Sequence, residues 1–285
     1  MENKIQIARE IMDVRAKVKE WKRQGLTVGF VPTMGYLHEG HVSLIECAKK
    51  QCDKVVVSIF VNPMQFGVNE DLDSYPRDFC ADTVLCQKIG VDLIFHPEVD
   101  EMYADGFCSF VDMNGLTKEL CGKSRPIHFR GVCTVVNKLF NIVMPDKAFF
   151  GQKDAQQLAV IRRMVKDLNM DIDIVGCPII REDDGLAKSS RNTYLNEEER
   201  KAALILSKTI RMGEKMVNEG VADVNELLVT MKENIATEPM AKIDYVEAVS
   251  MDTIEKIDKI EGEVLVAMAV YIGKTRLIDN FIIEK

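Results

Sequence analysis

The chain has little histidine, no excess of basic charge and no long apolar run. Its 285 residues include four His, and 37 Lys and Arg against 45 Asp and Glu give a formal net charge of −8. The basic residues are spread along the chain, whereas a nucleic-acid-binding protein usually carries a basic stripe. No window approaches the roughly 18 uninterrupted apolar residues that a membrane-spanning helix needs. We therefore expect neither a nucleic-acid partner nor a membrane segment, and any anionic ligand should be small.

The eight cysteines show no CxxC spacing, and none lies after Cys177. With so few histidines beside them, a structural zinc site is not expected. The N-terminal sequence MENKIQIARE is charged from its second residue and lacks the apolar core of a signal peptide. We therefore expect a cytoplasmic protein whose thiols are reduced and mostly buried as small apolar side chains.

The first half alternates short β-branched runs with helical patterns. Strands are predicted at 27–33, 55–61, 91–96, 148–150 and 172–180. Helical patterns include Val42, Leu44, Ile45 and Ala48, then Val84, Leu85 and Ile89, and a helix over about 154–168. This order predicts an α/β fold, a doubly wound parallel sheet of the Rossmann-like kind.

The pattern changes near residue 184. Amphipathic helices are predicted at 197–218 and 223–235, followed by strands at 243–249, 264–271 and 276–283. We therefore predict two domains, an α/β domain over 1–184 and a smaller α+β domain over 185–285. Segment 98–130 has weak periodicity and is predicted to be mainly loop.

The motif PTMGYLHEGH, residues 32–41, lies where the first predicted strand ends and a helix begins. Strand carboxyl ends face the ligand crevice of open α/β sheets, and a helix N-terminus favours phosphate. The spacing of His38 and His41 can bring both imidazoles to one side of the first helical turn, where they can stabilise charge on a phosphate. The alternatives are a chance pair, a helix cap or a zinc site, although a third zinc ligand at a convincing spacing is missing.

Three further motifs follow predicted strands or the domain junction. In FVNPMQF, residues 60–66, Gln65 must find a partner in backbone or ligand. In FFGQKDAQQLAV, residues 149–160, Lys153 supplies a cation, although an ordinary capped helix explains the pattern equally well. In DGLAKSSRNTYL, residues 184–195, Arg191 follows two serines that suit phosphate, and a linker that caps the next helix is the alternative. RPIHFRGVCTVV, residues 125–136, adds His128 and Arg130, while His96 is interpreted as a turn residue.

Together these motifs resemble the pantothenate synthetase family, also called pantoate–β-alanine ligases, within the nucleotidylyl transferases. PTMGYLHEGH, FVNPMQF, HFRGVCTVV, FFGQKDAQQL and DGLAKSSRN occur in order from about residue 27 to 195, and the last third resembles the family in length and pattern only. The resemblance implies ATP as a substrate with Mg²⁺ on its phosphates, pantoate and β-alanine as the other substrates, a covering C-terminal domain and a homodimer.

The resemblance also implies site residues. It implies that ATP is bound by Met34, Gly35, Tyr36, Leu37, His38, Glu39, Gly40, His41, Gly151, Gln152, Lys153, Asp154, Ile180, Lys188, Ser189, Ser190 and Arg191. The groups expected to act in catalysis are His38, His41, Lys153, Ser189, Ser190 and Arg191, with His41 as proton donor. Pantoate would contact Gln65 and Gln157, and β-alanine would contact Gln65; no protein side chain is expected to bind the metal. The chain departs from the family pattern at Tyr36, Ala155 and Lys188.

Two other functions remain open on the sequence. A different adenylyl transferase would act on a phosphorylated acceptor and would need further basic residues, whereas two glutamines suit a small hydroxy acid. A non-catalytic nucleotide sensor would not need both histidines, Lys153 and Arg191. Release of diphosphate would separate the enzyme from the sensor.

Overall fold

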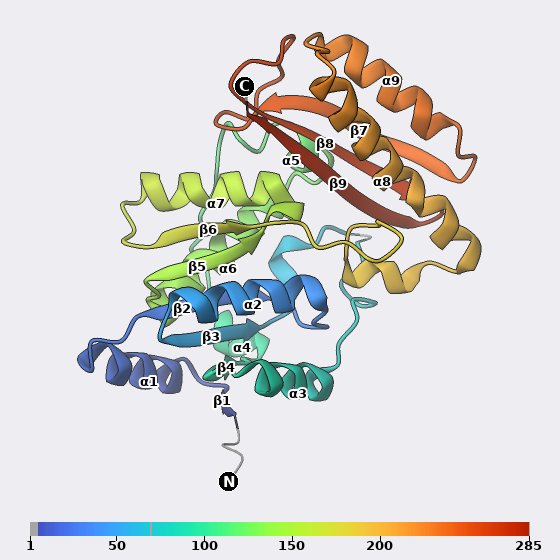
Figure 1. Ribbon diagram of the computed structural model, residues 1–285. Coiled ribbons are helices and arrows are strands. Elements are labelled where there is room, and N and C mark those ends of the chain that lie inside the picture. The colour runs from blue at the N-terminus through green and yellow to red at the C-terminus, as the bar shows by residue number, and fades with distance from the viewer. Residues whose placement is uncertain (1–4, 69, 285) are drawn as a thin grey trace. The chain divides into compact units, whose positions relative to one another are not determined.

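The computed structural model describes residues 5–68 and 70–284. Its larger sheet has six parallel strands in the order β1-β4-β3-β2-β5-β6 (Figure 1). The strands are β1 (Gln6–Ala8), β2 (Val28–Thr33), β3 (Lys54–Ile59), β4 (Leu93–Phe95), β5 (Lys147–Gly151) and β6 (Asp173–Cys177). The predicted doubly wound parallel sheet is confirmed, and β1 is an additional edge strand that the sequence did not predict.

The helices associated with this sheet were predicted less completely. They are α1 (Ile11–Arg23), α2 (Glu39–Gln51), α3 (Phe79–Ile89), α4 (Val99–Met102), α6 (His128–Val143) and α7 (Ala155–Asp167). Helices α1 and α6 were not predicted, and segment 98–130 is mainly irregular but includes α4, α5 (Leu120–Ser124) and the start of α6. The expected apolar face of α3 was partly wrong, because Val84 is 68% exposed whereas Cys86 and Asp82 are buried.

The sheet buries apolar side chains on both faces. On one face α2 lies against β2, β3 and β5, and Leu44, Ile45 and Ala48 contribute to a cluster that includes Phe149. On the other face α6 brings Phe140 into edge contacts with Phe30 and Phe150, at ring-centroid distances of 6.4 Å in both pairs. Burying each large apolar side chain contributes about 1.5–3 kcal/mol, so strands with two buried faces have continuous apolar runs.

The strand order changes direction between β2 and β5. β2 pairs with β3 on one side and with β5 on the other, through Gly29↔Lys147 and Phe30↔Ala148. Connections from β2 and β5 therefore diverge at the carboxyl edge, which opens a ligand crevice at such a switch point. The histidine motif follows β2, and Gly151 ends β5. Two of the predicted motifs thus leave neighbouring strands at this switch point.

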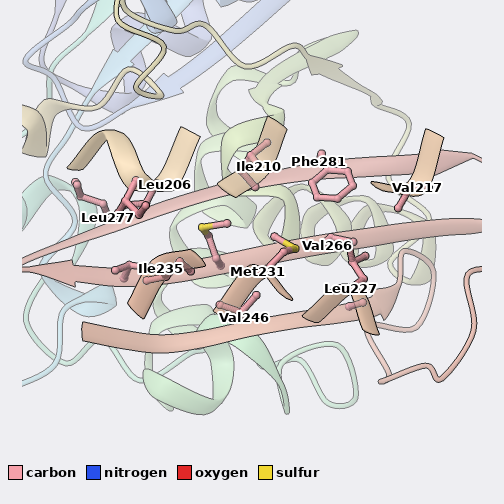
Figure 2. Close-up of a cluster of buried hydrophobic side chains, with 14 of the residues drawn as sticks. Leu206, Ile210, Val217, Leu227, Met231, Ile235, Val246, Val266, Leu277 and Phe281 are labelled. Atoms are coloured by element: carbon pink, nitrogen blue, oxygen red, sulfur yellow. The ribbon is translucent and has the colours of Figure 1, made fainter. Parts of the chain in front are cut away.

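The second sheet is an antiparallel meander of β7 (Ala241–Ser250), β8 (Glu263–Ile272) and β9 (Thr275–Glu284). The two predicted helices, α8 (Glu197–Asn218) and α9 (Val224–Ala236), contact one face of it. Figure 2 shows their apolar side chains meeting those of the strands, and the labelled residues are Leu206, Ile210, Val217, Leu227, Met231, Ile235, Val246, Val266, Leu277 and Phe281. The opposite face packs against Leu120, Ala155 and Ala159.

The chain forms two compact units. The N-terminal unit comprises residues up to 113, 127–152 and 160–178, and the C-terminal unit comprises 114–126, 153–159 and 179 onward. The second unit thus takes Lys153 and the start of α7 from the middle of the chain.

In the part of the chain that is described, no helix is both long and apolar enough to cross a membrane. All eight cysteines are free. The thiols were expected to be mostly buried, but only four of the eight cysteines are buried, and Cys80 and Cys108 are exposed.

Candidate active site

The two histidines of the first motif form the N-terminal cap of α2. The His38 Nδ1 accepts a hydrogen bond from Gly40 N at 3.1 Å, and the His41 Nδ1 accepts one from His38 N at 3.2 Å. The ring centroids lie 4.1 Å apart. The capping alternative is therefore correct, yet it does not exclude catalysis. Because each Nδ1 accepts, each neutral ring carries its proton on Nε2, where it is a hydrogen-bond donor.

The backbone amides around these histidines are used within the protein. Gly35 N donates to Thr33 Oγ1 at 3.1 Å, whereas Tyr36 N and Leu37 N donate to the two oxygens of Asp82 at 2.8 and 2.7 Å. His41 N donates to His38 O. These amides therefore hold the loop in shape.

Asp82, on α3, determines the conformation of this loop. Its side chain is only 3% exposed, and its two bonds close a turn in which Gly35 has φ +83° and Tyr36 has φ +52°. A Cβ on Gly35 would lie 2.9 Å from the Asp82 carboxylate, so only glycine fits that position. Tyr36 adopts a left-handed conformation that is uncommon for a non-glycine residue.

Burial raises the pKa of Asp82 above its usual value of 3.8, although the two backbone donors oppose this. The unfolded chain then loses this proton at lower pH than the folded chain. Between 3.8 and the raised folded-state pKa the native state binds more protons, so its free energy of unfolding falls as pH rises.

We predict that Asp82→Asn removes this pH dependence. Urea unfolding from pH 4 to pH 7 should show the variant gaining stability relative to the parent as pH rises. Asp171→Asn, at an exposed loop position, is the control and should track the parent protein. A constant difference between Asp82→Asn and the parent would contradict the role given to burial.

The side-chain amide of Gln65 is oriented by other side chains. Asn62 Nδ2 donates to Gln65 Oε1 at 3.1 Å, and Gln65 Nε2 lies 3.2 Å from Met34 Sδ. Asn62 Oδ1 in turn accepts from Tyr103 Oη at 2.7 Å, and burial raises the pKa of that phenol, which keeps it a donor. From the sequence, the Gln65 side chain was expected to bind either the protein backbone or a ligand. The two contacts given above are with the side chains of Asn62 and Met34.

Helix α6 fixes the backbone of the same turn, the 3₁₀ helix Pro63–Gln65. His128 Nδ1 lies 3.0 Å from Gln65 O, and Asn62 Nδ2 also donates to Gly131 O at 3.2 Å. A Cβ on Gly131 would overlap Met64 O and lie 2.5 Å from Gln65 Cα. Glycine is needed here for close approach of two backbones.

The space beside Gly151 is open. Apart from its chain neighbours, no heavy atom lies within 4 Å of the position that a Cβ on Gly151 would occupy. Its φ is not in the left-handed region that would require glycine. Its value is therefore the room it leaves at the end of β5, next to β2, for a group to approach the backbone.

The remaining predicted residues belong to the C-terminal unit: Lys153, Asp154, Gln157, Ile180, Lys188, Ser189, Ser190 and Arg191. Lys188 N donates to Ile180 O at 2.9 Å, so these two residues close a hairpin over 180–188. Ser189 caps the 3₁₀ helix Ser190–Tyr194 by accepting from Arg191 N at 3.3 Å. The next helix, α8, is capped by Asn196 instead, which removes the alternative that the serine segment serves that purpose.

Ion pairs hold this hairpin in place. Arg181 makes a bidentate pair with Asp279 of β9 at 2.7 and 3.0 Å, and Arg200 of α8 contacts Glu182 at 2.9 Å and Asp184 at 2.6 Å. Asn192 Nδ2 donates to Glu182 Oε1 at 2.7 Å. The Lys188–Arg191 segment thus starts from a braced hairpin.

Comparison with known proteins identifies the family. A family model described as pantoate-beta-alanine ligase matches residues 6–282. The chain belongs to the pantoate–β-alanine ligase family. It is accordingly an enzyme of this ligase class.

Curated relatives in this family cover almost the whole chain. A pantothenate synthetase of Ruminiclostridium cellulolyticum is 64% identical over 95% of this chain and 96% of its own length. One from Enterococcus faecalis is 62% identical over 98% of this chain and 99% of its own length.

Solved structures of the family agree with the fold. The pantothenate synthetase of Thermus thermophilus superposes with a TM-score of 0.93 at 42% identity, covering 97% of this chain and 99% of that one. The pantoate-beta-alanine ligase of Francisella tularensis, solved with beta-gamma ATP and beta-alanine, gives a TM-score of 0.80 at 35% identity and covers 97% of both chains.

The sequence did not identify the residues that hold this ligase's predicted site in shape. Asp82, Tyr103, Asp279 and Asn280 act through buried contacts far along the chain, and no local pattern marks them. A charged or amide residue within an otherwise apolar pattern was the one available signal, and it was present at Asp279–Asn280 inside RLIDNFII.

Proposed function

We propose that the chain condenses pantoate with β-alanine through a pantoyl-adenylate, giving pantothenate, AMP and diphosphate. The observation that carries this proposal is the pair of imidazoles at the N-terminus of α2, 4.1 Å apart and following β2 at the switch point. Two Nε2–H donors at such a position suit a phosphate chain. The ligand names of the Francisella tularensis structure, ATP and β-alanine, support the same substrates.

The chemistry requires activation of a carboxylate. An oxygen of the pantoate carboxylate attacks the α-phosphorus of ATP, a P–O bond forms, and diphosphate leaves with the electrons of the broken P–O bond. The amine of β-alanine then attacks the acyl carbon, AMP leaves, and the amine loses a proton. Charge grows on phosphate oxygens in the first step, so preorganised donors accelerate it. We assign this role to His38 and His41, and to Lys153, Ser189, Ser190 and Arg191.

We propose that ATP contacts Met34–His41, Gly151, Gln152, Lys153, Asp154, Ile180 and Lys188–Arg191. The open space at Gly151 favours close approach of the nucleotide to the backbone. Because the amides of the histidine loop are used internally, we expect side chains to make its phosphate contacts.

We propose Mg²⁺ as part of the nucleotide substrate. Within 5–68 and 70–284, no three or more His, Cys, Asp or Glu side chains are grouped to hold a metal ion. We expect the ion to bind through the phosphates of ATP, where it would neutralise phosphate charge. We further propose a cytoplasmic homodimer.

For pantoate we propose Gln65 and Gln157, and for β-alanine Gln65. Replacing either glutamine by Ala should weaken pantoate binding by about 0.5–1.5 kcal/mol, the net value of one neutral hydrogen bond, or more where the partner is a carboxylate. Isothermal titration with ATP alone should show nearly unchanged affinity. Equal losses for both ligands would identify the glutamines as structural.

A product assay tests the whole proposal. Purified protein supplied with Mg²⁺, ATP, pantoate and β-alanine should form AMP, diphosphate and pantothenate, and omission of β-alanine should leave one turnover of diphosphate. Formation of ADP and phosphate would rule out the adenylate. A nucleotide sensor would release no diphosphate, and an adenylyl transferase for phosphorylated acceptors would not turn over pantoate.

A further inference from the structure

The edge strand β9 holds two separate segments of the C-terminal unit through consecutive residues. Asp279 and Asn280 are only 1% and 3% exposed, although they are polar residues in the middle of an apolar strand. Burial of a charge or an amide is unfavourable unless each group is paired. Their partners therefore indicate why the strand carries them.

Asp279 holds the hairpin that leads into Lys188–Arg191. Its carboxylate accepts from both terminal nitrogens of Arg181, at 2.7 and 3.0 Å, and Arg181 also donates to Gly185 O at 3.2 Å. The hairpin in turn pairs Lys188 N with Ile180 O. The 3₁₀ helix Ser190–Tyr194 is itself in contact with β9. The Asp279 side chain lies on the face of the sheet where Leu277 and Phe281 meet α8 and α9.

Asn280 holds Lys153. Its Nδ2 donates to Lys153 O at 2.8 Å, immediately before α7 begins at Ala155. Side chains alternate along a strand, so Asn280 points to the face opposite Asp279. On that face Ala155 and Ala159 pack against Leu265 and Ala267 of β8.

We infer that Asp279 and Asn280 are positioning residues that set the spacing between Lys153 and the Lys188–Arg191 segment around the phosphates of ATP. Adjacent Cα atoms are about 3.8 Å apart, so the two attachment points cannot separate. The C-terminal sheet thereby contributes to adenylation without touching a substrate. This inference rests on the proposed function, which gives Lys153 and Arg191 their roles.

The test uses substitutions that remove the bond without removing volume. Asn280→Leu keeps the size of the side chain and places it on an apolar face, so the urea midpoint should stay the same or rise. Asp279→Asn keeps the shape of the side chain but replaces one carboxylate oxygen with an NH2 group, so Arg181 faces a second donor in place of an acceptor. For both, single-turnover diphosphate release from ATP and pantoate should fall about 10- to 100-fold at saturating ATP, since misplacement of about 1 Å can cost 100-fold.

A matched control is Asn234→Leu in α9, whose side-chain amide donates to Thr209 Oγ1 at 2.7 Å within the same unit. It removes a bond of the same kind away from both segments and should leave the rate unchanged. Equal slowing in this control would overturn a positioning role specific to β9.

Double variants separate positioning from general structure. In a protein that already carries Lys153→Ala, adding Asn280→Leu should slow diphosphate release little further, whereas in an Arg191→Ala protein it should slow release by its full factor. Asp279→Asn should behave in the opposite way, with little further effect beside Arg191→Ala and its full effect beside Lys153→Ala. Full additivity in all four combinations would overturn the inference while the proposed function stands. If Lys153→Ala and Arg191→Ala themselves leave adenylation unchanged, the proposed site and this inference both fail.

Discussion

Replacing His41 by Ala should slow formation of pantoyl-adenylate by about 100- to 1,000-fold, the usual cost of one preorganised donor to a developing charge. Binding of ATP in the ground state should change far less, because the stabilisation grows during transfer and therefore appears in kcat rather than KM. Single-turnover assays without β-alanine measure this step directly. Glu46→Gln, at an exposed position on α2, is the control and should retain the parent rate.

His41→Gln then distinguishes two roles of the ring. In the structure His41 Nδ1 accepts from His38 N, so a neutral His41 is an Nε2–H donor. Glutamine can accept with its oxygen and donate with its nitrogen, so we expect it to recover about tenfold or more of the rate, as a hydrogen bond to a charged group is worth about 1.5–3 kcal/mol. If glutamine is as slow as alanine, the ring acts as a proton donor, the role that the resemblance implied.

The second large effect is expected from Gly131→Ala. Alanine favours a helix interior by about 1 kcal/mol over glycine, but here its Cβ would overlap Met64 O and crowd Gln65 Cα. Backbone atoms cannot rotate away, so the clash should win. We expect a net loss of about 1–3 kcal/mol in the free energy of unfolding. Pantoate affinity should fall with it, because the turn that carries Gln65 must move.

Urea unfolding and pantoate titration measure both effects. Asn141→Ala, at an exposed position of the same helix, should change stability by only a few tenths of a kcal/mol. Unchanged pantoate affinity in a folded Gly131→Ala protein would show that α6 does not position Gln65.

The sequence predicted most of the fold because its strands have buried faces that impose long apolar runs. Helix 197–218 was predicted to the residue, since its amphipathic pattern extends over the whole range. Helix α6 was missed although Val132, Val135, Val136, Leu139 and Phe140 follow a helical spacing, because β-branched residues and Gly131 also suit a strand or loop. β1 is too short, at three residues, to show a pattern.

For the candidate site, the sequence identified residues that follow strands but not those that support them. His38 and His41 lie at a strand-to-helix junction, which local spacing can reveal. Asp82 contacts Tyr36 and Leu37 from 46 and 45 residues away, and Asn280 contacts Lys153 from 127 residues away. Such contacts depend on tertiary structure, which a single sequence does not encode locally.

The hydrogen bonds from the histidine loop to Asp82 also affect how much of the free energy of ligand binding is lost to ordering the loop. Fixing the backbone of one residue costs about 1–2 kcal/mol in conformational entropy. Since Asp82 already holds Tyr36 and Leu37, that ordering is complete when the chain has folded. In the proposed reaction the nucleotide meets a preorganised surface at this loop, so less of its interaction energy is lost to ordering and more remains for the transition state.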